Sequence, residues 1–150
     1  MSTSPIIAID TGKNGGFAWR DREGVACAVK MPSGMTEQVD GLRALRVELG
    51  RTASAVAEKV GTYRPGNSGP AAATFARHCG HIEAALFVLG ISTEQVAPGV
   101  WMRSLGALPK DKTARKKAIK EAMQRRHPHI KVTLSTADAL GILGWAEAKD

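Results

Sequence analysis

Residues 5–19 read Pro5-Ile-Ile-Ala-Ile-Asp10-Thr-Gly-Lys-Asn-Gly-Gly-Phe-Ala-Trp19, an apolar run that ends in a carboxylate, a glycine-rich break and a second apolar run. A continuous apolar block before such a break predicts a strand buried on both faces. Gly12, Gly15 and Gly16 can supply the positive φ of a tight reversal, so the second run should return antiparallel to the first. Asp10 is therefore expected at the C-terminal end of a central strand.

Asp10 raises the first question about function. A buried carboxylate is costly unless it has a partner, so metal or phosphate chemistry is one interpretation. The alternative is that Asp10 accepts backbone hydrogen bonds within the turn, as aspartates often do. This stretch alone does not decide between them.

The remaining pattern predicts the element order β-β-β-α-β-α-β-α-α. Further strands are expected at 25–31, 53–60 and 91–96. Helices are expected from Thr36 to about Gly50, from Pro70 to Leu89, from Thr113 to about Arg126, and from Ser135 or Thr136 onward, with a short one starting at Pro98. Gly80, on a small-residue face of the second helix, indicates close approach of another backbone, from the sheet or from a second subunit.

Length and composition describe one ordinary globular domain over residues 1–150, with 43% apolar and 23% charged residues. No apolar run is long enough to span a membrane and no signal peptide is visible, so no membrane association is expected. Two cysteines, Cys27 and Cys79, form no disulfide framework and favour the cytoplasm.

The net charge of +7 is concentrated in one segment. Between Arg103 and Lys131 there are ten Lys or Arg residues against only Asp111 and Glu121. A localised basic face indicates a polyanion partner, most commonly nucleic acid. The alternative is a solvated helix face with no partner.

Two more acids lie in apolar surroundings. Glu58 falls inside a predicted strand, where acids are depleted, although it could also face solvent beside Lys59. Asp138 opens the last, almost entirely apolar helix. There Ser135-x-x-Asp138 is similar to a capping box, which would explain Asp138 without any metal.

The ordered set of motifs resembles the RuvC-type Holliday-junction resolvases of the RNase H-like superfamily, in their short phage or prophage-like form. The resembling motifs are Ile-Ala-Ile-Asp10-Thr-Gly, Val-Ala-Glu58-Lys-Val, Phe75-Ala-Arg-His-Cys-Gly80, Val96-Ala-Pro-Gly-Val-Trp101 and Ala137-Asp138-Ala-Leu140. Each motif is weak alone, but together they cover nearly the whole chain in the right order.

The resemblance implies an α/β fold, with a five-stranded mixed sheet of order 3-2-1-4-5 flanked by helices, and a homodimer that acts on four-way or branched DNA. It implies that Asp10, Glu58 and Asp138 hold two Mg²⁺ ions, or Mn²⁺ in their place, and hydrolyse the phosphodiester with paired nicks. Lys112 would stabilise charge near the scissile phosphate. Tyr63 is the candidate for stacking at the junction centre, although its offset from Glu58 does not align cleanly. With the basic segment, the expected DNA contacts are Tyr63, Arg64, Lys110, Lys112, Arg115, Lys116, Lys117 and Lys120.

One position departs from the family pattern. The family usually has a fourth ligand, Asp or His, about three residues before the last aspartate, where this chain has Ser135. Three acids could suffice, Glu147 or a water could complete the set, or the protein could bind branched DNA and cut it poorly.

Two other classes of function compete with a nuclease. A catalytically weak junction-binding protein would use the basic face alone. A sugar- or acetate-kinase-like phosphotransferase also opens with an Asp-x-Gly turn on this fold, but such enzymes clamp ATP between two domains. The single domain and the basic segment argue against that class, so no nucleotide cofactor is expected.

Overall fold

A computed structural model describes residues 4–59 and 69–149 of the chain. The elements run in the order β1 (Ile6–Asp10), β2 (Gly16–Arg20), β3 (Ala26–Lys30), α1 (Met35–Leu49), β4 (Ser54–Glu58), α2 (Gly69–Val88), β5 (Ser92–Val96), α3 (Pro98–Arg103), α4 (Lys112–Arg126) and α5 (Leu134–Lys149). The described strands form one five-stranded sheet of order β3-β2-β1-β4-β5. This order and the mixed strand directions confirm the predicted fold class.

β1 lies at the centre of the sheet and sets its register. It pairs antiparallel with β2, with Asp10 opposite Gly16, and parallel with β4, with Ile9 beside Ala57. Because β1 and β4 are parallel, their C-terminal residues, Asp10 and Glu58, emerge at the same edge of the sheet. The topology therefore brings together two acids that are 48 residues apart in sequence.

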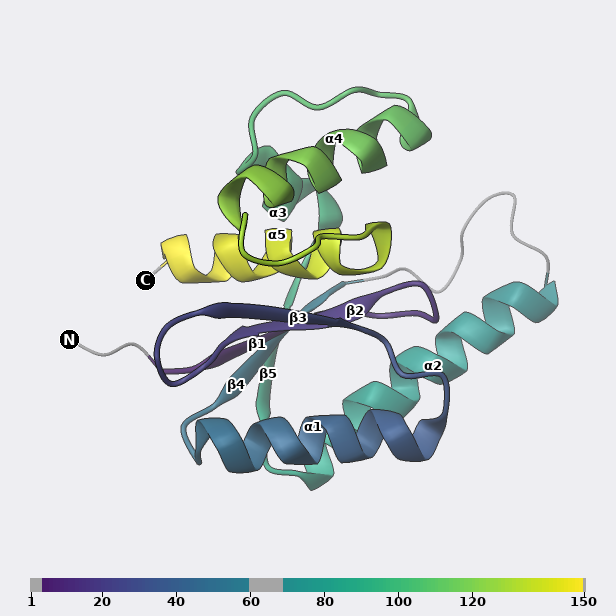
Figure 1. The fold of residues 1–150 in the computed structure, drawn as a ribbon. Coiled ribbons are helices and arrows are strands. Elements are labelled where there is room, and N and C mark those ends of the chain that lie inside the picture. Colours follow the sequence, from purple (N-terminus) through teal and green to yellow (C-terminus); the bar gives the residue numbers. More distant parts are fainter. Residues whose placement is uncertain (1–3, 60–68, 150) are drawn as a thin grey trace.

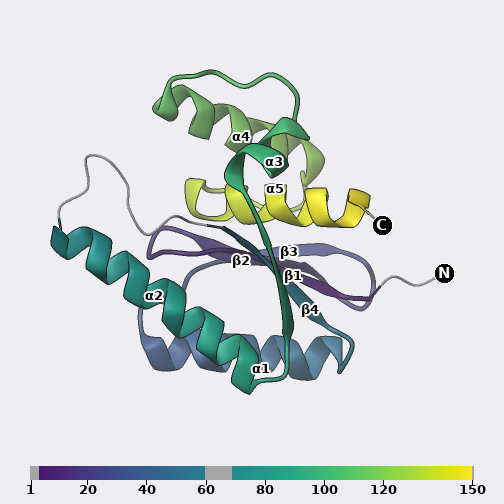
Figure 2. The same cartoon turned by 180° about the vertical axis from the view of Figure 1, so that it is seen from behind.

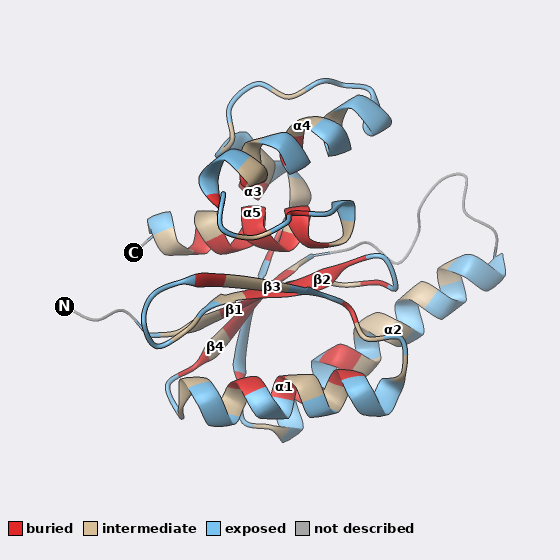
Figure 3. Ribbon diagram, viewed as in Figure 1, coloured by how far each residue is buried: buried red, intermediate tan, exposed pale blue. Residues whose placement is uncertain are grey.

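The sheet is the middle layer of three (Figure 1). α1 and α2 cover one face, α5 packs on the other, and α4 lies outside α5; the view from behind shows the same layering (Figure 2). Ile7 and Ile9 of β1 enter the core under α1 and α2, whereas Ala8 enters the core under α5. All three side chains have no exposed surface, so β1 is buried on both faces as predicted. Figure 3 shows the two buried layers on either side of the sheet.

The β1–β2 turn depends on its glycines in a different way from the one predicted. Of the three glycines in this turn, Gly12 alone has a positive φ, of 120°. Gly15 and Gly16 are required by close packing instead: an added Cβ would lie 1.9 Å from the Asp10 carbonyl oxygen at Gly15 and 2.5 Å from the Val29 carbonyl oxygen at Gly16. The turn therefore folds tightly against the end of β1 that carries Asp10.

α1 and α2 each begin one residue before the predicted range, and Gly34 is the N-cap of α1. For Gly80 the structure excludes one of the two predicted neighbours. Gly80 of α2 is exposed, and an added Cβ there would meet no atom within 4 Å, so the sheet is not the backbone that approaches it. The small-residue face of α2, which consists of Ala73, Ala76, Gly80 and Ala84, is directed outward and continues to Phe87, which is 85% exposed.

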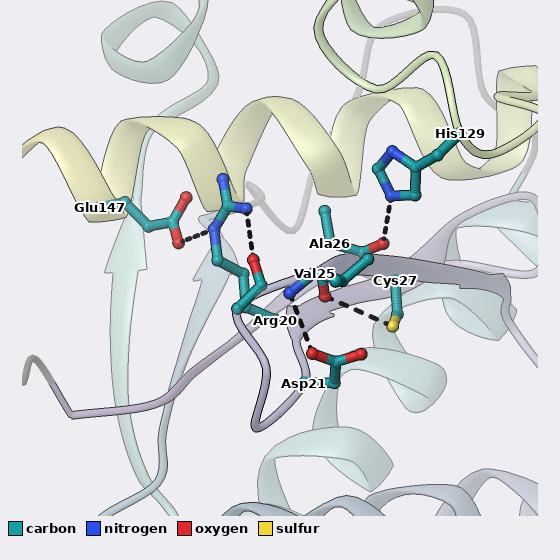
Figure 4. Close-up of polar contacts among 8 residues, drawn as sticks. Arg20, Asp21, Val25, Ala26, Cys27, His129 and Glu147 are labelled. Atoms are coloured by element: carbon teal, nitrogen blue, oxygen red, sulfur yellow. Dashed lines mark hydrogen bonds and ion pairs between the residues drawn. The ribbon is translucent and has the colours of Figure 1, made fainter.

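Polar contacts tie the C-terminal half of the chain to the β2–β3 hairpin (Figure 4). Arg20 at the end of β2 pairs with Glu147 of α5, with Nε and Oε2 2.6 Å apart, and donates from Nη1 to the Gly24 carbonyl. His129, in the α4–α5 connection, donates from Nε2 to the carbonyl oxygen of Ala26 at 3.0 Å. These contacts fix α5 along the sheet, with its N-terminal end toward the Asp10 edge.

No helix within residues 4–59 and 69–149 combines the length and the apolar character that a membrane span requires. Cys27 and Cys79 are both half-buried, and neither takes part in a disulfide. Burial, with the nearby Asp21 and Glu48 carboxylates, raises the pKa of the Cys27 thiol, so it remains protonated at neutral pH.

Candidate nucleic-acid cleft with three carboxylates

A cleft of about 1040 Å³ opens at the edge of the sheet where β1 and β4 end. Asp10, Glu58 and Asp138 all line it, from β1, β4 and α5 respectively. The structure therefore brings together the three acids that the sequence singled out. Each is half-buried, so each carboxylate is partly removed from water while it stays accessible from the cleft.

Glu58 does not simply face solvent. Its Oε2 accepts a hydrogen bond from Nε1 of Trp101, at 2.8 Å. Trp101 belongs to α3 and is completely buried. This contact fixes Glu58 at the base of the cleft, and the solvent-facing alternative for Glu58 is wrong.

Asp138 is not a capping residue. α5 is capped two residues earlier than predicted: the backbone N–H of Thr133 donates to Thr136 Oγ1 at 3.0 Å, and the Thr133 carbonyl accepts from the backbone N–H groups of Thr136 and Ala137. Asp138 therefore lies beyond the cap. Burial raises the pKa of its carboxyl group, while Lys116 and Arg115 of α4 act in the opposite direction.

Basic side chains surround the acids in this cleft. Five of them line it: Lys13, Lys59, Lys112, Arg115 and Lys116. Lys112 is exposed on the first turn of α4, which Asp111 caps by accepting from the Ala114 N–H at 2.9 Å. Lys110, Lys117 and Lys120 are also exposed but are not among the lining residues. The cleft thus combines a carboxylate base with a positively charged rim.

Solved structures share this architecture. The chain matches Thermus thermophilus RuvC in complex with a Holliday junction substrate with a TM-score of 0.60 and 16% identity, over 98% of this chain and 96% of that one. A second Thermus thermophilus RuvC structure matches with a TM-score of 0.54 and 18% identity, over 97% and 96% of the two chains. The chain has the RuvC fold. Neither a protein-family profile nor a curated protein sequence matches it.

On this RuvC fold the donor set suits a hard divalent cation, because Mg²⁺ and Mn²⁺ prefer carboxylate oxygens. The burial of Asp138 also favours a cation site, since a bound cation would offset the desolvation cost of the ionised carboxylate. Within the described residues, however, no group of three or more acidic, histidine or cysteine side chains lies close enough to hold a metal ion. The three acids share the cleft without forming a closed cluster.

Neither Ser135, at the position of the family's fourth ligand, nor Glu147, its suggested replacement, lines the cleft. Ser135 is not among its lining residues, whereas its neighbour Leu134 is. Glu147 is nine residues beyond Asp138 on α5, roughly 13 Å along the helix axis, where it pairs with Arg20. The suggestion that Glu147 completes the acidic set is therefore wrong.

Three residues were not predicted as functional: Lys13 and Lys59, which line the cleft, and Trp101, which does not line it but donates a hydrogen bond to Glu58. Lys13 and Lys59 follow the ends of β1 and β4, so the parallel pairing of these strands could have placed them beside Asp10 and Glu58. Trp101 is the last residue of the Val96-Ala-Pro-Gly-Val-Trp101 motif, and the resemblance assigns it no role. The sequence gives no indication that its indole reaches Glu58, because the contact spans 43 residues and two elements. Tyr63 and Arg64, predicted to contact DNA, lie outside the described residues.

Asp138 gives a testable pH dependence of stability. Its pKa is raised in the folded protein above the ordinary aspartate value of about 4, so ionisation of Asp138 disfavours folding as pH rises through the folded-state pKa. We expect Asp138→Asn to increase the free energy of unfolding at pH 7, with a gain that shrinks toward pH 4. Urea unfolding with a chelator present, between pH 4 and pH 8, measures this difference.

The exposed carboxylate Glu121 on α4 provides the control for this measurement. Glu121→Gln should show no comparable gain at pH 7. A lower stability of Asp138→Asn at pH 7 than at pH 4, relative to wild type, would show that the ionised carboxylate makes a stabilising contact.

Proposed function

We propose that the protein is a divalent-metal-dependent endodeoxyribonuclease that cleaves four-way DNA junctions. The observation that carries this proposal is the convergence of Asp10, Glu58 and Asp138 on one cleft with a basic rim. The RuvC fold, including a relative solved with a Holliday junction substrate, supports DNA as the polyanion. The concentration of positive charge on α4 supports the same partner.

The chain's own residues divide the work of hydrolysis between them. Asp10, Glu58 and Asp138 would hold Mg²⁺ or Mn²⁺, and two bound cations supply Lewis-acid stabilisation of the phosphodiester and an activated water. Lys112 lines the cleft on the first turn of α4, where its ammonium group can neutralise charge that develops on the scissile phosphate. Arg115 and Lys116 extend this positive surface along α4 and would position the DNA backbone.

A synthetic mobile four-way junction tests this function directly. Incubation with and without Mg²⁺, read on a denaturing gel, should show paired strand cuts only when Mg²⁺ is present. Tight binding with no cleavage in either Mg²⁺ or Mn²⁺ would instead support the second candidate, a branched-DNA-binding protein. The absence of a closed three-acid group among the described residues and the serine at position 135 are the observations that keep this candidate in the test.

Asp10→Asn is expected to keep junction binding and to lose cleavage. Its carboxylate is assigned to the cation rather than to DNA, so neutralising it should not weaken the approach of phosphate. Loss of a direct ligand should reduce the cleavage rate by more than the roughly 10–100-fold that outer-shell partners contribute. Gel-shift and cleavage assays on the same junction separate the two effects, and cleavage at the wild-type rate would refute the assignment of Asp10.

The basic face of α4 should make junction binding depend steeply on salt. Each phosphate that is neutralised contributes about −0.9 to the slope of log affinity against log salt. Replacing Lys116, Lys117 and Lys120 with Ala should weaken binding and make this slope shallower by up to about 3 units. Fluorescence anisotropy across a salt series measures both quantities.

The control removes the same charge from another face. Arg22, Arg43 and Arg51 are exposed on or beside α1, across the sheet from the α4–α5 layer, and none of them lines the cleft. Their replacement with Ala should leave the slope nearly unchanged. Equal slopes for wild type and the α4 variant would return these lysines to the role of a solvated helix face.

We also propose that the protein acts as a homodimer, because a junction presents two symmetric strands to be cut. The outward small-residue face of α2, with Gly80 at its centre, would allow close contact between subunits. Gly80→Leu should give a folded monomer, since the added side chain meets open space within its own subunit but blocks the partner. Analytical ultracentrifugation measures this, with Glu121→Leu as the control for an added exposed leucine. A wild-type protein that stays monomeric at micromolar concentration with junction bound would contradict the proposal.

A further inference from the structure

Trp101 contacts β4 and α5, two of the three elements that carry the carboxylates of the cleft. One edge of its indole meets Glu58, through the 2.8 Å hydrogen bond from Nε1 to Oε2. The ring has no exposed surface, so no water competes for this donor. A hydrogen bond to an ionised carboxylate in such surroundings is stronger than a neutral one and fixes the direction of the acceptor.

The opposite edge of the indole lies on α5. A Cβ added at Gly141 would be 2.6 Å from Cζ3 and 3.1 Å from Cε3 of Trp101, so the ring rests directly on the helix backbone and only glycine leaves room for it. Gly141 lies three residues after Asp138, so the two positions are neighbours on the surface of α5, about one helical turn apart. The six-membered ring thus contacts the helix that carries Asp138, while the pyrrole nitrogen holds Glu58.

We propose that Trp101 is a positioning residue that sets the place of Glu58 relative to Asp138, and thereby the affinity of the cleft for its divalent cation. This inference rests on the proposed metal-dependent function. The indole acts as a rigid spacer: its length separates β4 from α5, and its single donor orients the Glu58 carboxylate. Trp101 acts on the cation site through Glu58, because Trp101 itself is not among the residues that line the cleft.

Two substitutions disturb this spacer from opposite ends. Trp101→Phe removes the donor and keeps an aromatic ring, whereas Gly141→Ala keeps the donor and pushes the ring away from α5. Each has a matched control. Trp19→Phe removes an indole N–H that is buried but has no hydrogen-bond partner among the described residues, and Gly144→Ala adds a methyl group that meets only the end of the Arg126 side chain, at 3.3 Å.

The first measurement is Mn²⁺ binding to the DNA-free protein, followed by the electron paramagnetic resonance signal of free Mn²⁺. Outer-shell partners typically contribute 10–100-fold to metal affinity, so Trp101→Phe and Gly141→Ala should each weaken Mn²⁺ binding by about tenfold or more. Trp19→Phe and Gly144→Ala should stay within about twofold of wild type, below the smallest effect expected for an outer-shell partner. In junction cleavage the two test variants should need more Mg²⁺ for half-maximal rate, while the rate at saturating Mg²⁺ stays close to wild type.

The second measurement needs neither metal nor activity. The indole ¹H–¹⁵N resonance of Trp101 should shift when Glu58 is replaced with Ala, whereas the resonances of Trp19 and Trp145 should not. An unmoved Trp101 resonance overturns the inference even if Trp101→Phe fails to fold.

The outcomes separate this inference from the proposed function. Wild-type protein that binds Mn²⁺ and cleaves junctions, with test variants equal to their controls, would overturn the role of Trp101 and leave the nuclease intact. Wild-type protein that neither binds Mn²⁺ nor cleaves in Mg²⁺ would overturn both.

Discussion

The burial of β1 on both faces is the constraint on which the rest of the structure depends. Ile7 and Ile9 fill the core beneath α1 and α2, and Ala8 fills the core beneath α5, so neither face of this strand can be exposed without opening a core. A strand buried in this way must pair on both sides, and it does so with β2 and β4. The first place where the chain can carry a charge is where the strand ends, at Asp10.

The charge distribution of the cleft follows from this layering. α5 is apolar around most of its surface because it lies between the sheet and α4. Its N-terminal part meets the open edge of the sheet and carries Asp138 there, whereas its other carboxylate, Glu147 near the C-terminal end, pairs with Arg20. α4 packs on the outer side of α5 and is free to place basic side chains at the rim. The acids thus lie on the buried elements β1, β4 and α5, whereas three of the five basic residues that line the cleft lie on the outer helix α4 and the other two, Lys13 and Lys59, follow β1 and β4. Opposed charges that are fixed on separate rigid elements suit a site that must hold both a cation and a phosphate.

The order of strands and helices along the chain was predictable from local signals in the sequence, whereas the strand order within the sheet was expected from the resemblance to RuvC-type resolvases. The block from Ile6 to Ile9 and the almost uniformly apolar α5 have patterns that only buried elements produce, and the ranges of the other helices follow from periodicity. Asp10, Glu58 and Asp138 stood out for the same reason, as acids in apolar surroundings. The errors concern contacts between distant segments. Gly15 and Gly16 have no room for a Cβ because of the Asp10 and Val29 backbones, and no local pattern distinguishes that requirement from a positive φ.

The sequence also did not determine which residues cap the helices or which helix faces point outward. Ser135 and Asp138 have the spacing of a capping box, but Thr133 and Thr136 have it two residues earlier and form the cap. Gly80 has the same sequence signature whether it packs on a sheet or faces outward. The role of Trp101 could not be predicted, since it depends on the distance between β4 and α5, which is set by the packing of the whole layer. A crystal structure of the protein soaked in Mn²⁺, with anomalous difference maps, tests the central claim most directly. Our account predicts peaks bounded by the Asp10, Glu58 and Asp138 carboxylates; a well-ordered cleft without a peak at saturating Mn²⁺, or Mn²⁺ bound only elsewhere, would contradict it.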